Sequence, residues 1–320
     1  MTNEKHFTDD LIDAIGKDDS LSDDAKTTVM KNIQKLRNTK VNILITGATG
    51  CGKSSTINGL FGSERAKVGQ GVNPQTMDIQ KYEYSNIILW DSPGLGDGTE
   101  IDNRHSKNII DKLYEKDGNG DVLIDLVLVI LNGSTRDLGT SYTLINQVII
   151  PNLGEDKKRL LVAINRADMA MDGDYWSKEK NCPEQELINF LGQQVISIQT
   201  RIKASTGIDV EPIYYSAGRK RGNLAQNPYN LSKLLLFILR HTKQEKRAVF
   251  AQDINKDQTM WKDDDRLENY SEAIKKTWLD SVVETIGDVA NVVGDVLNVA
   301  VDIGGAISRG LSKVRSWLPW

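Results

Sequence analysis

Hydrophobic residues from position 41 onward form two kinds of run. Short runs rich in β-branched residues predict strands, and longer stretches in which apolar positions recur every three or four residues predict helices. We expect strands at 41–46, 78–84, 86–91, 124–131, 159–164 and 211–215. We expect helices around 53–61, 102–116, 139–150, 184–203 and 231–241. This alternation predicts an α/β fold with a mostly parallel sheet that is covered by helices on both faces.

Two of the expected strands, 78–84 and 86–91, are separated by Ser85 alone. Runs this close can pair only through a tight hairpin, so one strand of the sheet should run antiparallel to the others. The run at 124–131 is almost entirely apolar, which is typical of a central strand buried on both faces. We therefore expect a six-stranded sheet with one antiparallel strand.

Helical patterns flank this region on both sides. Residues 8–38 predict two short helices, whose apolar stripes either pack on another part of the chain or form a surface for self-association. Residues 242–270 are charged and polar and have no clear period. We expect an N-terminal helical extension at 1–40, an α/β domain at 41–241, a charged linker or exposed helix at 242–270 and an amphipathic helical segment at 271–320.

The last of these segments carries one narrow polar stripe on an otherwise apolar helix. The stripe consists of Glu284, Asp288, Asn291, Asp295, Asn298 and Asp302. Four acids argue against a simple transmembrane span, whereas residues 308–320 are basic and contain tryptophans, as interfacial membrane segments do. Two interpretations remain open: the apolar face packs on the rest of the chain, or it is exposed to a membrane or a partner.

Composition narrows the class of protein without identifying it. The chain has 320 residues and a net charge of −4, from 40 basic and 44 acidic residues, which argues against nucleic-acid binding through bulk charge. Its two cysteines, Cys51 and Cys182, are too few for a disulfide framework and fit a reducing compartment. Because the first seven residues lack the apolar core of a signal peptide, we expect a cytoplasmic protein.

A glycine-rich loop lies between the first expected strand and the first expected helix of the α/β domain. It reads Gly47, Ala48, Thr49, Gly50, Cys51, Gly52, Lys53 and Ser54, the pattern G-x-x-x-x-G-K-S, and Ser55 follows. Glycines let the backbone wrap closely around a polyphosphate, which the N–H groups of the loop and of the helix N-terminus can bind. Lys53 would reach the β- and γ-phosphates, and the Ser54 hydroxyl would hold Mg²⁺. The loop predicts binding of a nucleoside triphosphate.

Two further segments supply groups for the phosphate end of such a ligand. Asp91 ends an expected strand, where its carboxylate can bind Mg²⁺, usually through water, and Gly94 can offer its N–H to the γ-phosphate. Residues 69–76 form a glycine-rich loop in which Thr76 is our candidate to complete the Mg²⁺ shell. Order in this loop would then depend on the γ-phosphate, which is the physical basis of a switch.

The base of the nucleotide would meet residues that follow two later strands. Asp168 follows the strand at 159–164, and a carboxylate there can accept two hydrogen bonds from guanine, whereas adenine lacks that donor pair. Asn165 would tie the base to the phosphate loop. Ser216 and Ala217 follow the last strand, and their backbone amides could contact the guanine O6. These residues predict a preference for GTP and GDP.

The four motifs, in this order, resemble those of the TRAFAC-class P-loop GTPases. Residues 47–54, 91–94, 165–168 and 216–217 match the first, third, fourth and fifth GTPase motifs, and the resemblance covers about residues 8–240. The likeness is to the Era-like branch, in particular the prophage-associated YfjP-like bacterial GTPases. The helices before residue 40, the segment 131–137 and the insert 172–183 support that group. Septin-like and immunity-related GTPases share the Thr-Gly-x-Gly-Lys-Ser-Ser style of loop and remain alternatives.

Three positions depart from the usual motifs of these GTPases. Arg166 replaces the Lys whose stem packs on the base, and Gly218 replaces the Lys of the fifth motif. Leu95 stands where Ras-type switches have a Gln that orients the attacking water. Because leucine cannot hydrogen-bond water, intrinsic hydrolysis should be slow. The candidates to assist are Asp97, Thr99, His105 and Arg136, although a lone surface histidine is more often simply solvated.

The resemblance implies a Ras-like GTPase domain that binds GTP and GDP with Mg²⁺ and hydrolyses GTP slowly. Lys53, Thr76 and Gly94 would be the catalytic residues, and Ser54, Thr76 and Asp91 would hold the metal. A homodimer across the nucleotide face would accelerate hydrolysis, and residues 281–320 would provide a peripheral membrane contact. The alternative is a nucleotide-gated binding module with negligible turnover. Nucleic acid is not an expected partner.

Overall fold

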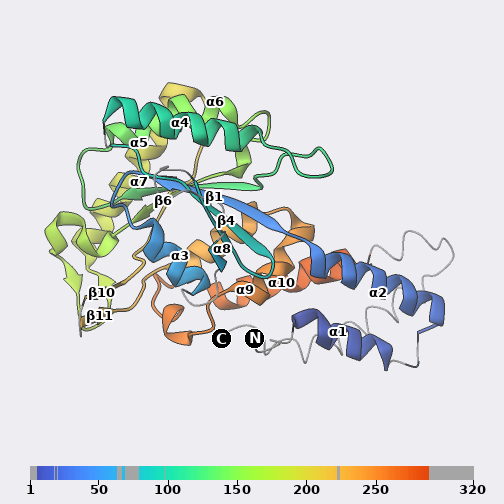
Figure 1. Ribbon diagram of the computed structural model, residues 1–320. Coiled ribbons are helices and arrows are strands. Elements are labelled where there is room, and N and C mark those ends of the chain that lie inside the picture. Colours follow the sequence, from blue (N-terminus) through green and yellow to red (C-terminus); the bar gives the residue numbers. More distant parts are fainter. Residues whose placement is uncertain are drawn as a thin grey trace.

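A twisted sheet runs through the middle of the protein, with helices on both faces (Figure 1). The structure is a computed structural model that describes residues 6–17, 19, 21–62, 67–68, 79–96, 98–221 and 224–287. The strands of the main sheet lie in the order β2-β3-β4-β1-β5-β6-β9. They are β1 (Val41–Gly47), β2 (Lys67–Val68), β3 (Gln80–Glu83), β4 (Ile87–Asp91), β5 (Leu126–Asn132), β6 (Leu160–Asn165) and β9 (Ile213–Tyr214).

The pairing of these strands confirms the expected mixed sheet. Strands β4, β1, β5, β6 and β9 pair in parallel, and β3 runs antiparallel to both of its neighbours. The six expected strands are all present, and the two-residue β2 adds a seventh at the edge. A run of two residues is too short to show a period of two, which is why the sequence pattern did not indicate it.

Helices connect the parallel strands, as crossover connections require. Of the main helices, α4 (Thr99–Tyr114) and α7 (Gln185–Thr206) lie in such connections, whereas α3 (Lys53–Phe61) follows β1 and α8 (Leu231–His241) follows the last strand. The helix expected at 139–150 consists of α5 (Gly139–Thr143), a π-helical η1 (Leu144–Ile149) and α6 (Ile150–Asn152). Pro151 cannot donate the next α-helical hydrogen bond, and the wider π turns end just before it.

Alternate residues of the central strand β5 serve two separate cores. Leu126, Leu128 and Ile130 face the core that contains α3 and α8. Val127 and Val129 face the opposite core, which contains α4, η1 and α7. This alternation is what a strand covered on both faces must show, because successive side chains point to opposite sides of the sheet.

Short elements complete the loops around the sheet. They are η2 (Lys157–Arg159), η3 (Ala167–Gly173), β7 (Trp176–Ser177), β8 (Cys182–Pro183), β10 (Arg219–Arg221) and β11 (Leu224–Gln226). None of the helices in the described part of the chain is both long enough and apolar enough to cross a bilayer.

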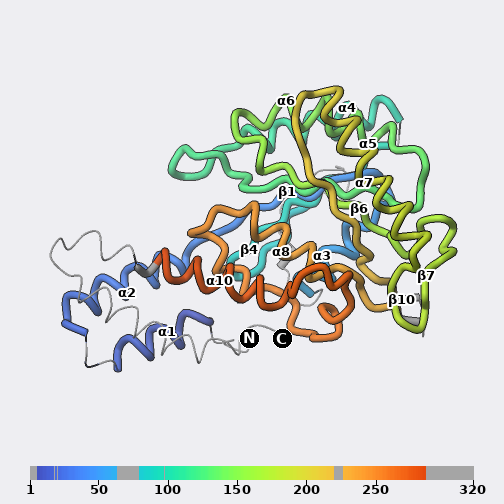
Figure 2. Tube along the Cα trace, turned by 180° about the vertical axis from the view of Figure 1, so that it is seen from behind, coloured from blue at the N-terminus to red at the C-terminus, as the bar shows by residue number. Residues whose placement is uncertain are grey.

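The two ends of the described chain pack together on the α3 and α8 side of the sheet (Figures 1 and 2). This helical module contains α1 (Phe7–Gly16), α2 (Asp23–Asn38), η4 (Gln244–Val249), α9 (Phe250–Asp253) and α10 (Tyr270–Gly287), and the short η5 (Gln258–Met260) follows α9. Phe7 packs edge-on against Trp278, with ring centroids 5.7 Å apart. The Trp278 indole donates to the carbonyl of Ala248 at 2.6 Å. The apolar stripes of α1 and α2 therefore pack on another part of the chain.

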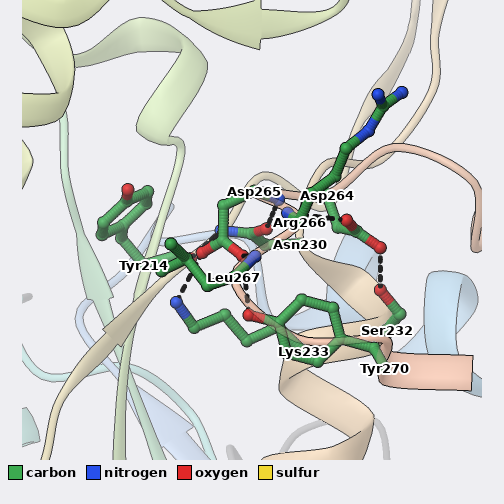
Figure 3. A network of polar contacts seen from close by, with 9 residues as sticks. All are labelled: Tyr214, Asn230, Ser232, Lys233, Asp264, Asp265, Arg266, Leu267 and Tyr270. Carbon is green, nitrogen blue, oxygen red and sulfur yellow. Dashed lines mark hydrogen bonds and ion pairs between the residues drawn. The ribbon is translucent and has the colours of Figure 1, made fainter. Parts of the chain in front are cut away.

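Residues 242–270 differ from the expected charged linker or exposed helix. The apolar residues 248–251 are buried in the main core, next to the buried Asp253. The acidic residues 263–265 lie against the start of α8, where Lys233 and the Tyr270 hydroxyl each donate to Asp265 at 2.6 Å (Figure 3). Although burial opposes ionisation, these two hydrogen bonds hold the pKa of Asp265 below its ordinary value. The segment has no helical period because it combines a 3₁₀ turn, one α turn and a loop.

Asp253 joins the helical module to the β3–β4 hairpin. Its carboxylate accepts hydrogen bonds from the backbone N–H groups of Ser85, Asn86 and Ile87, at 3.0, 2.6 and 2.7 Å. The Asn86 side chain in turn donates to the carbonyls of Arg37 and Thr39 and contacts the His6 imidazole. Two buried backbone donors and the part-buried N–H of Ser85 thus depend on one carboxylate for their partners.

Replacing Asp253 by alanine should destabilise the protein by about 3 kcal/mol, because two buried N–H groups and the part-buried N–H of Ser85 lose their acceptor at once. The measurement is the midpoint of thermal unfolding followed by circular dichroism. Asp209→Ala is the matched control, since Asp209 is exposed and pairs only with the exposed Lys203. Equal midpoints for the two variants would contradict the role assigned to Asp253.

Candidate functional site

The glycine-rich loop at 47–54 connects the C-terminal end of β1 to the N-terminus of α3. Glycine is required at two of its positions. A Cβ on Gly47 would lie 2.2 Å from the Ile130 carbonyl oxygen, and one on Gly52 would lie 2.3 Å from the Asn165 side-chain nitrogen. Gly52 also has a φ of 95°, which disfavours any side chain. The backbone can therefore pass closely between β5 and β6.

The start of α3 presents hydrogen-bond donors without a competing cap. Gly52 is its N-cap residue, and it has no side chain that could accept from the first N–H groups. The Lys53 ammonium donates to the Gly47 carbonyl at 3.3 Å, which holds it over the loop, and Ser54 and Ser55 are exposed in the first turn. Free backbone donors, a helix N-terminus and a lysine together form a site for a polyanion.

Asp91 lies beside this loop at the end of β4, where it pairs in register with Ile45 of β1. Its Oδ1 atom is buried and has no hydrogen-bond partner within the described ranges. Burial raises the pKa of Asp91 to about 6, and the charge of Lys53 only partly offsets this effect. A buried carboxylate oxygen without a partner is suited to bind a cation or a water molecule held by one.

The residues present therefore fit a magnesium ion. Ser54, at the end of the phosphate loop, and Asp91, at the end of the neighbouring strand β4, are hard oxygen donors of the type that Mg²⁺ prefers. Within the described ranges, no three His, Cys, Asp or Glu side chains gather into a group that could hold a metal by themselves. A magnesium ion here would need further ligands from bound phosphate and water, as is usual for this metal.

Residues 92–96 continue from Asp91 and lie directly against the phosphate loop. The Ser92 hydroxyl donates to the Thr46 hydroxyl at 2.7 Å, and the Ser92 backbone N–H donates to the Ile45 carbonyl at 3.0 Å. A Cβ on Gly94 would lie 2.4 Å from the Thr49 nitrogen, so only glycine fits there. The sequence placed Gly94 near the γ-phosphate, and the structure brings it into contact with the phosphate loop.

Asn165 connects the phosphate loop to the segment after β9. Its side-chain nitrogen donates to the Cys51 carbonyl at 2.9 Å, and its side-chain oxygen accepts from the Ala217 N–H at 2.9 Å. Asn165 is itself almost fully buried, so both hydrogen bonds are protected from water. Two loops that are 166 residues apart along the chain, at positions 51 and 217, are thereby held against the end of β6.

Asp168 lies next to this connection and is 6% exposed. Its Oδ1 atom accepts from the Ser216 hydroxyl at 2.7 Å, and that hydroxyl accepts from the Gly218 N–H at 3.3 Å. Arg166, between Asn165 and Asp168, is exposed and has a φ of 62°. The carboxylate of Asp168 is thus fixed in orientation, while the Arg166 side chain is available to a ligand.

The structure brings together the residues predicted for the first, third and fourth motifs and the segment 216–217. Thr76 and Asp97 lie outside the described residues. His105 differs from the expectation of a solvated surface histidine, because it is 1% exposed and its Nδ1 lies 3.1 Å from the Gly94 carbonyl oxygen. Sequence reasoning also missed Gly133, whose N–H donates to the Asn165 carbonyl at 2.8 Å. The only signal for Gly133 was its place directly after the end of the central strand.

Asp91 should destabilise the protein when no cation is bound. A folded-state pKa of about 6, above the ordinary value of 3.8, means that folding favours the protonated carboxyl. The cost is absent below pH 3.8, grows as the pH rises from there to about 6, and is constant above it. Asp91→Asn should therefore raise the stability of the ligand-free protein at pH 8 by on the order of 2 kcal/mol.

The measurement is the thermal midpoint of both proteins without nucleotide or magnesium at pH 8, 6 and 4.5. The difference should shrink as the pH falls, because the wild-type carboxyl becomes neutral in the folded state. A constant difference across this range would show that Asp91 does not titrate as described.

Comparisons with known proteins agree with the geometry of the phosphate loop. Residues 10–114 match the family model described as "Interferon-inducible GTPase (IIGP)". The mouse interferon-inducible GTPase 1 is 34% identical over 91 residues, which cover 27% of this chain and 22% of that protein. The mouse interferon-gamma-inducible GTPase 10 is 28% identical over 149 residues, which cover 45% of this chain and 31% of that protein.

Among solved structures, the probable GTP-binding protein engB covers 63% of this chain and 98% of its own, with 21% identity and a TM-score of 0.37. The chain spans less than a third of the length of the curated relatives it matches. The segment 10–114, which contains the phosphate loop and Asp91, is similar to the interferon-inducible GTPases.

Proposed function

We propose that this protein binds GTP and GDP with Mg²⁺ and hydrolyses GTP slowly to GDP and phosphate. One observation carries the proposal: the Asn165 side chain bonds both the phosphate loop, at Cys51, and the segment that would contact the base, at Ala217. The polyanion site and the candidate base site are therefore parts of one continuous site. The similarity of residues 10–114 to interferon-inducible GTPases supports the same activity.

Each group of the phosphate end has a separate task. The N–H groups of the loop and Lys53 bind the phosphates, and they neutralise charge that develops on the leaving β-phosphate. Ser54, Asp91 and Thr76 hold the metal, with Asp91 acting through water. A bound Mg²⁺ would supply positive charge that stabilises the negative charge of the phosphates. Gly94 donates its N–H to the γ-phosphate, which makes the position of residues 92–96 depend on that group.

The base end selects guanine by its hydrogen-bond donors. Asp168 accepts from N1–H and N2–H₂, and the Ser216 hydroxyl holds the carboxylate in place for this contact. Arg166 lies over the base in place of the usual lysine stem, and the backbone amides at 216–217 approach O6. Adenine presents an acceptor where guanine has N1–H, so it would leave the Asp168 carboxylate unpaired.

Slow hydrolysis follows from Leu95. This side chain is 3% exposed and packs in the apolar core with Ile109 and Leu113, so it neither faces nor orients a water molecule. A group from a second copy that approaches the nucleotide face would supply the missing function. The alternative is a nucleotide-gated binding module with negligible turnover, which the buried Leu95 also favours.

Two finer assignments remain part of the proposal. Placement in the Era-like branch, beside the YfjP-like GTPases, stays a prediction, and immunity-related GTPases are the alternative that the family match favours. Peripheral membrane contact through residues 281–320 also stays a prediction. Ser281 and Val282 are buried in the helical module, so such a contact would use residues after them, beginning with the exposed Val283.

Asp168→Asn should change the preference from guanine to xanthine nucleotides. The amide cannot accept from both N1–H and N2–H₂, but it can donate to the 2-oxo group of xanthine. Calorimetric titration with GDP and with xanthosine diphosphate, in magnesium, measures the change, and GDP affinity should fall at least 100-fold. Asp172→Asn makes the same chemical change on an exposed residue and is the control. If wild-type protein releases no heat with guanine nucleotides, the proposed function is wrong.

The specific rate of phosphate release from GTP should rise with protein concentration if a second copy completes the site. A colorimetric phosphate assay over a 100-fold range of protein concentration tests this, with Lys53→Ala as the inactive reference. A low rate that does not change with concentration would argue for an unassisted GTPase. No release at any concentration, with nucleotide bound, would favour the binding module.

A further inference from the structure

The loop at 93–96 is held against the phosphate loop by α4. The His105 ring, on α4, is 1% exposed, and its Nδ1 lies 3.1 Å from the Gly94 carbonyl oxygen. A carbonyl can only accept a hydrogen bond, so Nδ1 must carry the hydrogen in this contact. His105 therefore acts as a donor to the residue that packs on Thr49 of the phosphate loop.

A second contact from the same helix holds the same loop. The Asp102 carboxylate, almost one turn before His105, accepts from the Gly96 N–H at 2.9 Å. Between these two contacts, Leu95 is buried against Ile109 of α4. Three consecutive loop residues, at 94, 95 and 96, are thus fixed by one helix.

Stability alone does not explain a histidine at this position. The other ring nitrogen, Nε2, is buried and has no hydrogen-bond partner among the residues that the structure describes. A buried polar atom without a partner costs free energy, which a leucine or phenylalanine in the same apolar core would not. The hydrogen bond to Gly94 is what the imidazole provides and an apolar side chain cannot.

Gly94 needs such a restraint. Glycine is required there because a Cβ would collide with Thr49, yet glycine also has the greatest backbone freedom of any residue. Fixing the Gly94 carbonyl limits rotation about its ψ angle, and the buried Ser92 fixes the chain on the other side. These restraints on both sides of Gly94 limit where its N–H points.

We propose that His105 is a positioning residue for recognition of the γ-phosphate. It holds the Gly94 carbonyl so that the N–H of the same residue faces the third phosphate when GTP is bound. The role rests on the proposed function, since it requires a nucleoside triphosphate in this site. It is specific to the triphosphate, because GDP has no group at the place that the Gly94 N–H serves.

The test compares binding of GDP and of the non-hydrolysable analogue GMPPNP, each with magnesium, by calorimetric titration of the full chain. His105→Asn keeps an N–H donor close to the Nδ1 position, whereas His105→Gln keeps the amide but moves it one bond further, and His105→Leu removes the donor. We expect His105→Leu and His105→Gln to weaken GMPPNP binding about tenfold while GDP affinity changes less than twofold. His105→Asn should restore most of the loss.

His241→Leu is a matched control. The His241 Nδ1 also lies close to a backbone carbonyl oxygen, that of Phe237, at 2.8 Å, but at the end of α8. This variant should change neither affinity. Circular dichroism and the thermal midpoint of each variant show whether it folds. If His105→Leu does not fold, the Asn and Gln variants, which differ by one methylene, still decide the test.

Equal losses for GDP and GMPPNP, or no loss for either, in a folded His105→Gln protein would overturn the positioning role. So would a His105→Asn protein that discriminates no better than His105→Gln. If the wild-type protein binds neither nucleotide, the proposed function fails first, and the inference fails with it. If the wild type binds both and only the His105 variants behave otherwise than expected, the inference alone is wrong.

Discussion

The candidate site depends on the side-chain amide of Asn165. Its two hydrogen bonds connect the Cys51 carbonyl and the Ala217 N–H, and neither loop has another contact of this kind to the other among the hydrogen bonds of the described chain. Gly52 must be glycine because the amide occupies the space of its Cβ. The phosphate loop therefore has its shape because β6 ends in an asparagine, and the segment after β9 has its place for the same reason.

The candidate site and the attachment of the helical module lie at opposite ends of strand β4. The parallel strands β4, β1, β5 and β6 bring the chemistry to their carboxyl ends, where ligands bind in open α/β sheets. The helical module is attached at the opposite end of β4, through the Asp253 carboxylate and the turn at 85–87. Asp253 binds one end of β4 and Asp91 lies at the other, which gives the terminal helices a direct connection to the strand that carries the proposed metal ligand.

Local patterns in the sequence were enough for the strands and the main helices, and they picked out several residues that the structure brings together at the carboxyl ends of the strands. The alternation of strand and helix periods indicated a mostly parallel sheet and the antiparallel hairpin. The residue types at 47–54, Asp91, Asn165 and Asp168 indicated a nucleotide site because each lies at or after the end of a strand. The burial of residues 248–253 could not be predicted, since a 3₁₀ turn has no helical stripe and Asp253 is polar. The burial of His105 was also missed. Its hydrogen-bond partner is the backbone carbonyl of Gly94, which no sequence pattern displays.

The same site is costly to the protein when it is empty of ligand. Among the residues that the structure describes, Asp91 has a buried oxygen without a partner, His105 has a buried nitrogen without one, and Gly94 gives up the stability that a side chain would add. All three lie on the phosphate side, on β4, the loop after it and α4, whereas on the base side the Asn165 amide and one carboxylate oxygen of Asp168 have hydrogen-bond partners. A rigid base site and an unsatisfied phosphate site are what a switch requires, because the nucleotide can remain bound while only the groups around its last phosphate change their partners.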